Sequence, residues 1–149
     1  MVQNTGTVDL DNLQLTENLE MEFGAGVYVG VITPPSIAVG PAETADGYAA
    51  PTLATWDGGL GASGSTTIFD GMSGTLVPGD TMTVEFTIEI DPDANGASNG
   101  GLDNTAEVSA TGPDGMTVMD DSDSGTVPNS DNPGEPGDMG TSDLSLIHI

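Results

Sequence analysis

The side chains best suited to chemistry in this chain are oxygen-bearing groups that gather at two points of the sequence. The first group alternates along the run 91–96, and the second lies further along the chain. Together they comprise Asp91, Asp93, Asn95, Asp120, Asp121 and Asp123. Oxygen side chains at alternate positions, followed by a glycine that turns the chain, are typical of calcium-binding loops. The sequence therefore predicts calcium as the cofactor candidate, held at these residues, although the predicted function requires no cofactor.

Neither group completes a known calcium motif. In an EF-hand the twelfth loop position carries a bidentate glutamate, but counted from Asp91 that position is Leu102, and Pro92 fits poorly into such a loop. The first group therefore predicts either a weaker calcium site of another geometry or a polar turn between two strands. The second group predicts either a calcium site or a solvated segment between domains. Extracellular calcium modules bind at about 0.1 to 1 mM, so few ligands would suffice.

The sequence lacks several of the residues from which enzyme active sites are built. A serine or threonine nucleophile needs a neighbouring base, whereas the chain has no Lys, no Cys and a single histidine, His148. The run 123–126 is similar to one loop of an aspartic protease, but that chemistry needs two such carboxylates sharing a proton. The glycine pattern of residues 59–64 matches a dinucleotide-binding loop, yet a Ser/Thr-rich segment follows it instead of a helix. We predict a protein that is not an enzyme.

Aromatic side chains offer another route to a ligand, because a flat exposed ring can stack on a sugar. The candidates for a glycan site are Trp56 and Tyr48, with Tyr28 as a third. Trp56 precedes an Asp-Gly-Gly run, so it could equally anchor a loop or fill the core, and we favour these structural roles over glycan binding.

Electric charge restricts the partners. The chain has 24 Asp and Glu residues and no Lys or Arg, which gives a formal net charge of −24 at pH 7. Nucleic acids and anionic membrane surfaces are both bound through basic side chains, so these two partners are excluded. The carboxylates repel one another without an internal counter-charge. We therefore predict that the stability of the fold rises with salt or calcium.

The elements that carry these residues are predicted to be β-strands, because short apolar bursts alternate with stretches rich in Gly and Pro. The clearest strand covers residues 81–90, where Met, Val, Phe and Ile alternate with Thr and Glu. Weaker segments of the same kind are 10–19, 27–32, 37–39, 67–69, 102–110 and 116–119. We expect Pro34-Pro35 to stop the run 27–32. Residues 40–64 are expected to form a long surface excursion with one weak strand near 53–56.

Three short motifs suit structural roles. Asn4 and Gly6 follow a strand stub and suit a tight turn, with Gly6 supplying a positive φ if one is required. Pro78-Gly79 suits the middle of a type II turn that leads into the strand at 81–90. Asn104, on a strand edge, is expected to hydrogen-bond the backbone of a neighbouring loop.

Both ends of the sequence are expected to be cut. Residues 144–149 are an in-frame translation of the transposon end used in preparing sequencing libraries, so we interpret them as adapter-derived, which removes His148 from any natural site. Residues 128–143, rich in Asp, Pro and Gly, predict an acidic linker to a next repeat that this chain lacks. At the other end a strand is already finishing at Asn4, so we expect that the first strand or strands are missing and that the domain covers residues 1–127.

A family resemblance follows from the order and spacing of several motifs. They are Asn4-Thr5-Gly6, Leu13-Gln14-Leu15-Thr16-Glu17-Asn18-Leu19, Leu76-Val77-Pro78-Gly79-Asp80, Thr83-Val84-Glu85-Phe86 and Leu102-Asp103-Asn104-Thr105-Ala106. Over about residues 2–127 the chain resembles the Asn-Thr-Gly repeat of bacterial surface proteins known as domain of unknown function eleven. It departs from that repeat by lacking the strand or strands that should precede Asn4, which leaves an open sheet edge.

The resemblance implies an all-β, immunoglobulin-like sandwich, strung in tandem along a large secreted or cell-wall protein. It implies an extracellular or cell-surface location, with the export signal outside this fragment. We therefore expect a non-enzymatic spacer or adhesion module of a bacterial surface protein. Its expected partners are neighbouring repeats of the same chain and, for an adhesion module, surface glycans or other cells. The alternative is a glycan- or calcium-binding module of an adhesin.

Overall fold

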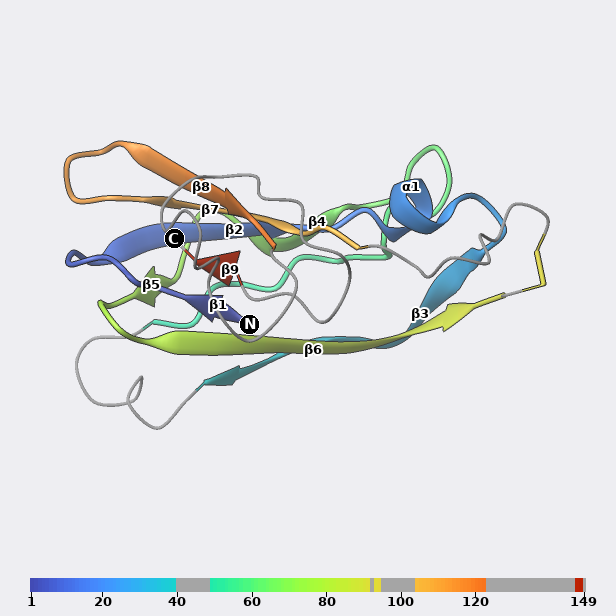
Figure 1. Ribbon diagram of the computed structural model, residues 1–149, viewed down its shortest axis with the longest axis horizontal. Coiled ribbons are helices and arrows are strands. Elements are labelled where there is room, and N and C mark those ends of the chain that lie inside the picture. The colour runs from blue at the N-terminus through green and yellow to red at the C-terminus, as the bar shows by residue number, and fades with distance from the viewer. Residues whose placement is uncertain (40–48, 92, 95–103, 123–146, 149) are drawn as a thin grey trace, which may run out of the picture.

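Two β-sheets packed face to face make up the described part of the chain in the computed structural model (Figure 1). The structure describes residues 1–39, 49–91, 93–94, 104–122 and 147–148. In chain order the elements are β1 (Val2–Gln3), β2 (Leu10–Thr16), α1 (Leu19–Phe23), β3 (Tyr28–Val39), β4 (Thr67–Asp70), β5 (Thr75–Leu76), β6 (Thr81–Ile90), β7 (Glu107–Thr111), β8 (Thr117–Asp121) and β9 (Ile147–His148). The predicted all-β sandwich is confirmed.

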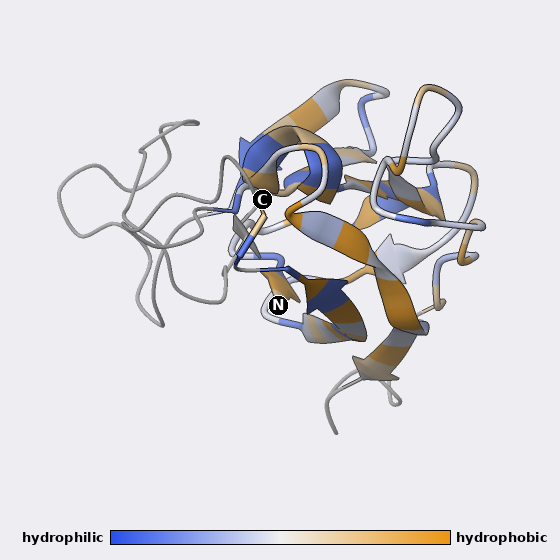
Figure 2. Cartoon of the chain, turned by 90° about the vertical axis from the view of Figure 1, so that its right-hand side faces the viewer, coloured by the Kyte–Doolittle hydropathy of each residue, from blue (hydrophilic) through white to orange (hydrophobic). Residues whose placement is uncertain are grey.

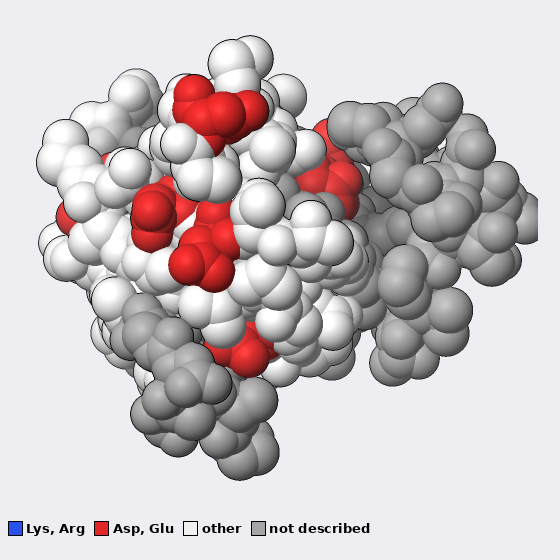
Figure 3. Space-filling view, turned by 90° about the vertical axis from the view of Figure 1, so that its left-hand side faces the viewer, with Lys and Arg blue, Asp and Glu red and all other residues white. Residues whose placement is uncertain are grey.

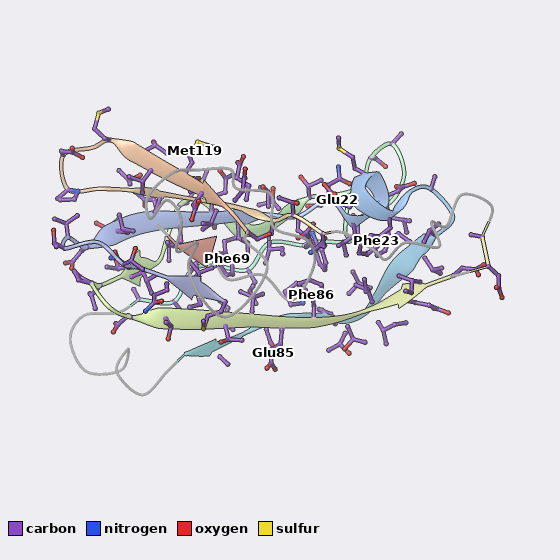
Figure 4. The ribbon with its side chains drawn as sticks, viewed as in Figure 1. Glu22, Phe23, Phe69, Glu85, Phe86 and Met119 are labelled. Atoms are coloured by element: carbon purple, nitrogen blue, oxygen red, sulfur yellow. The ribbon has the colours of Figure 1, made fainter. Side chains whose placement is uncertain are left out.

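The first sheet has the strand order β3-β6-β1-β9. β6 is the long strand expected from its alternating pattern: Phe86 points toward the other sheet and Glu85 points away from it (Figure 4). β1 pairs antiparallel with β6, so that Val2 lies opposite Met82. β9 joins β1 in parallel, with Val2 opposite Ile147. The pairing does not test whether residues 144–149 derive from a sequencing adapter, so that origin stays a prediction.

β3 differs from its expected course. The prediction that Pro34-Pro35 stops the strand is wrong, because β3 continues through both prolines to Val39. The pairing of β3 with β6 shifts its register between Thr33 and Ser36, which places the prolines at a bulge. β3 is also the outermost described strand of its sheet, and an edge strand tolerates residues that have no N–H to donate. The prolines therefore interrupt the ladder without ending the strand.

The second sheet has the order β4-β2-β7-β8, and β5 also pairs with β2. Within β2, Asn12 adopts a φ of 55°, and the register against β7 shifts between Asp11 and Gln14. An ordinary strand would place Leu10 and Leu13 on opposite faces, because side chains alternate. The bulge turns both of them into the core, where both are buried.

The core fills the space between the sheets, and apolar and polar bands alternate along the strands that enclose it (Figure 2). Its buried members are Val2, Leu10, Leu13, Leu15, Leu19, Tyr28, Trp56, Ile68, Phe69, Leu76, Met82, Ala106, Val108 and Ala110. The rings of Trp56 and Phe86 lie 4.6 Å apart at an interplanar angle of 57°. This tilted arrangement is a favourable aromatic contact.

The short helix α1 was not expected, since residues 10–19 were assigned to one strand-like segment. Asn18 caps it by accepting a hydrogen bond from the Met21 N–H at 3.1 Å, and Leu19 is buried on its inner side. The helix ends at Gly24, whose φ is 93°. α1 lies at one end of the sandwich, beside the loop of residues 57–65 (Figure 1). Of the described helices, none has the length and apolar character of a membrane span.

The described part of the long excursion, residues 49–64, has little regular structure. The weak strand expected near 53–56 is reduced to an isolated bridge between Leu53 and Phe69, and a second bridge joins Ala49 to Thr75. Residues 40–48 and the predicted linker 128–143 lie outside the described residues.

Candidate functional site

The first predicted calcium group lies in a turn after β6. The Asp91 carboxylate accepts a hydrogen bond from the Asp93 N–H at 3.0 Å, and the Asp91 N–H donates to the Val27 carbonyl at 2.7 Å. Both carboxylates are exposed. Asn95, the third predicted ligand, lies outside the described residues. In the part that is described, Asp91 acts as a turn-forming side chain.

The second predicted calcium group begins at the end of β8. Asp120 and Asp121 are consecutive strand residues, so their side chains leave opposite faces of the sheet. The Asp120 carboxylate accepts a hydrogen bond from the Asp121 N–H at 3.1 Å. Asp123 lies outside the described residues. Among the residues that the structure describes, no group of three or more acidic, histidine or cysteine side chains could hold a metal ion. Calcium binding stays a prediction.

The glycan candidate Trp56 is a core residue. Its side chain is only 5% exposed, and the indole Nε1 donates a hydrogen bond to the Glu17 main-chain carbonyl at 2.9 Å. A buried ring cannot stack on a sugar, so the structure agrees with the interpretation of Trp56 as a core filler. Tyr28 is also buried, and its hydroxyl donates to the Asp57 carbonyl at 2.6 Å. Tyr48 lies outside the described residues.

The turn that begins at Asn4 is held by the side chain of Asn4 itself, which is fully buried. Its amide Nδ2 donates to the carbonyls of Val8 and Leu76, both at 2.8 Å, and its Oδ1 accepts from the Gly6 N–H at 2.9 Å. Gly6 has no positive φ. A Cβ at Gly6 would meet the Asn4 Oδ1 at 3.1 Å, so a larger residue there would require the hydrogen-bonded Asn4 side chain to shift by a few tenths of an ångström.

The turn predicted at Pro78-Gly79 is confirmed. The Asp80 N–H donates to the Val77 carbonyl at 3.1 Å, and Gly79 has a φ of 86°, as the third position of a type II turn requires. The Gly79 N–H also donates to the Asn4 carbonyl at 2.8 Å. The motifs Asn4-Thr5-Gly6 and Pro78-Gly79, which carry much of the family resemblance, therefore form one hydrogen-bonded unit.

A site that the sequence did not indicate forms around Glu17, which lies between β2 and the cap of α1. Glu17 is 2% exposed, and its N–H donates to the Thr66 carbonyl at 2.8 Å. Its Oε2 accepts a hydrogen bond from the Asn104 Nδ2 at 3.1 Å. The expectation that Asn104 bonds the backbone of a loop was wrong. Its amide bonds a buried carboxyl group instead, because folding brings the segment before β7 beside the end of β2.

The electrostatics of this site are unusual for a carboxylic acid. Burial, the largest cause, and the nearby Glu22 carboxylate raise the pKa of Glu17, while the hydrogen bond from Asn104 lowers it. The net pKa is about 7. The sequence contains no Lys or Arg that could offset a buried negative charge. The Glu17 Oε1 and the Asn104 Oδ1 are both buried without a hydrogen-bond partner. The sequence offered one signal, because Glu17 occupies the same alternate positions as Leu13, Leu15 and Leu19, but it gave no indication of the partner of Glu17.

Comparison of this chain with protein-family models, with curated proteins and with solved structures finds no match. The resemblance to a bacterial surface repeat is therefore carried by the motifs quoted above, and the roles it implies remain predictions.

Proposed function

We propose that this chain is a non-enzymatic, immunoglobulin-like structural repeat of a large secreted or cell-surface bacterial protein, and that it serves as a spacer or adhesion module. The observation that supports this proposal is the use made of buried polar groups. Asn4 holds two turns together, Trp56 fastens a loop to the core, and Tyr28 fastens the loop that begins at Asp57. These contacts stabilise a small sandwich against deformation, which is the property that a spacer needs.

The surface charge supports the same function. With 24 acidic residues and no Lys or Arg, every copy carries a strong negative charge. On the face shown in Figure 3 the carboxylates form separate red patches with no basic residue between them. Like-charged domains repel at short range, so such repeats remain soluble and separated when they are concentrated at a surface.

The alternative, a glycan- or calcium-binding module of an adhesin, has less support. Two of its three glycan candidates, Trp56 and Tyr28, are enclosed in the core. Of the calcium candidates, Asp91 and Asp120 each accept a hydrogen bond from a nearby main-chain N–H. We therefore retain the glycan- or calcium-binding module as the second candidate.

Force spectroscopy on the chain, held by a handle at each end, tests the proposal. A spacer should resist load and unfold in one cooperative event that recurs after refolding. Isothermal titration calorimetry against a panel of cell-surface glycans should then show no saturable binding. A chain that extends without an unfolding event contradicts a load-bearing role, and saturable glycan binding favours the adhesin alternative.

A further inference from the structure

Glu17 and Asn104 join two parts of the sandwich that are far apart in the sequence. Glu17 follows β2, and Asn104 precedes β7, the strand that pairs with β2. Their side chains meet through the bond from Asn104 Nδ2 to Glu17 Oε2. The Trp56 indole closes over the same place by donating to the Glu17 carbonyl. The contact between Glu17 and Asn104 therefore lies between the second sheet and the Trp56 side chain.

The bonding at this contact is incomplete when Glu17 is ionised. An ionised carboxyl group only accepts hydrogen bonds, and so does the carbonyl oxygen of an amide. Glu17 Oε1 and Asn104 Oδ1 are both buried without a donor. A buried acceptor without a donor is costly, and a buried charge costs more. A single proton on Glu17 could supply the missing donor and remove the charge at once.

We propose that Glu17 is held as a neutral carboxylic acid whose Oε1–H donates to Asn104 Oδ1 while Asn104 Nδ2 donates to Glu17 Oε2. The two planar groups then form a ring with two hydrogen bonds, and each of the four polar atoms has a partner. Loss of the proton to solvent breaks one of these bonds and leaves a buried anion beside the amide oxygen. The pair is thus a proton-dependent lock between the end of β2 and the start of β7.

The surroundings of the pair favour the protonated form. From α1, the Glu22 carboxylate opposes a second negative charge and raises the pKa of Glu17, while the adjacent Asn18 main-chain amide lowers it. On either side of the loop of residues 57–65, the Trp56 indole donates to the Glu17 carbonyl and the Thr66 carbonyl accepts from the Glu17 N–H, and both contacts are neutral. No Lys or Arg exists in the sequence. Burial is the largest of these effects, and together they raise the pKa of Glu17 to about 7.

The direction of the pH effect follows from this shift. The pKa of Glu17 rises from 4.5 to about 7 on folding, so the folded chain binds this proton more tightly than the unfolded chain does. The stabilising contribution of the lock is complete below about pH 4.5 and is lost as the pH rises from there to about 7. Above about pH 7 the lock is open, and no further change is expected from this group.

The substitution Glu17→Gln tests the lock, because glutamine reproduces the shape and the donor of the neutral acid at every pH. Melting temperatures are measured by circular dichroism from pH 5 to pH 8 at constant ionic strength. We expect E17Q to melt higher than the original chain by roughly 5 °C at pH 8 and to approach it at pH 5. Glu107→Gln, which removes one exposed carboxylate on β7, is the matched control. It should run parallel to the original chain across this pH range.

A direct readout separates a shared proton from a merely structural role. The carboxyl carbon of Glu17, followed by NMR with carbon-labelled glutamate, should titrate near pH 7, and this resonance should be absent from E17Q. Titration near the ordinary glutamate value, or a melting difference between E17Q and the original chain that does not vary with pH, overturns the proposal. A rise in the melting temperature with millimolar calcium at pH 8 that E17Q abolishes would also overturn it, since a metal ion would then occupy the place of the proton.

Discussion

At the scale of single residues, stability depends on a few polar side chains whose bonds are made inside the sandwich. Asn4 uses both amide hydrogens and its oxygen, and thereby links the first turn of the chain to the segment before β6. The hydrogen bonding of Glu17 and Asn104 is less complete, because each residue has one oxygen without a donor when Glu17 is ionised. The hydrogen bonds of Asn4 are therefore predicted to stabilise the fold at all pH values, and the contact between Glu17 and Asn104 only when Glu17 carries a proton.

The substitution Asn4→Ala should destabilise the fold by about 2 to 3 kcal/mol, because it leaves buried carbonyl groups without donors. Urea unfolding followed by circular dichroism measures the change. Thr7→Ala, an exposed position in the same turn, is the control and should stay within about 0.5 kcal/mol of the original chain. Equal losses in the two variants would show that the bonds of Asn4 contribute nothing particular.

At the scale of elements, the loop of residues 57–65 is ordered by one carboxylate. The Asp57 Oδ1 accepts from the N–H groups of Gly59, Leu60 and Ser65 at 3.0, 3.2 and 2.8 Å. The Gly61 N–H also donates to Glu20 on α1. The glycine pattern of this loop, which is shared with dinucleotide-binding sites, is thus used to wrap the chain around its own aspartate.

The substitution Asp57→Ala should release this loop while the two sheets persist. We expect amide hydrogen exchange to become much faster at residues 59–65 and global stability to fall by about 2 kcal/mol. Asp114→Ala is the matched control, since that carboxylate accepts from a single N–H, that of Met116, in an exposed turn. Unchanged protection of the loop in D57A would show that packing against Tyr28 orders it instead.

At the scale of the whole molecule, uncompensated negative charge opposes folding. The charge is −24, and like charges even meet across strands, where Glu107 lies opposite Asp121. Salt shortens the reach of this repulsion, from about 10 Å at 0.1 M to about 3 Å at 1 M. The effect is spread over the surface and needs no specific binding site.

The melting temperature should therefore rise between dilute buffer with EDTA and molar sodium chloride. Millimolar calcium, compared with sodium chloride of matched ionic strength, tests the predicted sites at the same time. A further rise in the melting temperature with calcium, abolished in the double variant Asp91→Asn, Asp93→Asn, would show that a calcium ion binds at these two residues. A melting temperature that does not respond to salt would contradict the view that charge repulsion limits this fold.

Prediction from the sequence succeeded where the signal is local. The strand 81–90 and the turn at Pro78-Gly79 follow from alternation and from the φ that glycine allows, and both are present in the structure. Prediction failed where contacts with other parts of the fold decide the local structure. β3 passes through Pro34-Pro35 because it is an edge strand with a bulge, and α1 forms because Asn18 caps a turn that buries Leu19.

The sequence by itself determined the all-β class, because that class depends on local periodicity. Total charge, also known from the sequence, is the basis of two further predictions: nucleic acids and anionic membranes are not partners, and salt stabilises the fold. Only the tertiary structure decided which polar residues are buried and with what. Trp56 lies in the core, and Glu17 meets Asn104 across 87 positions of the chain. A pKa depends on the solvent and charges in space around the group, so a carboxyl group with a raised pKa could be identified only once the two sheets were in place.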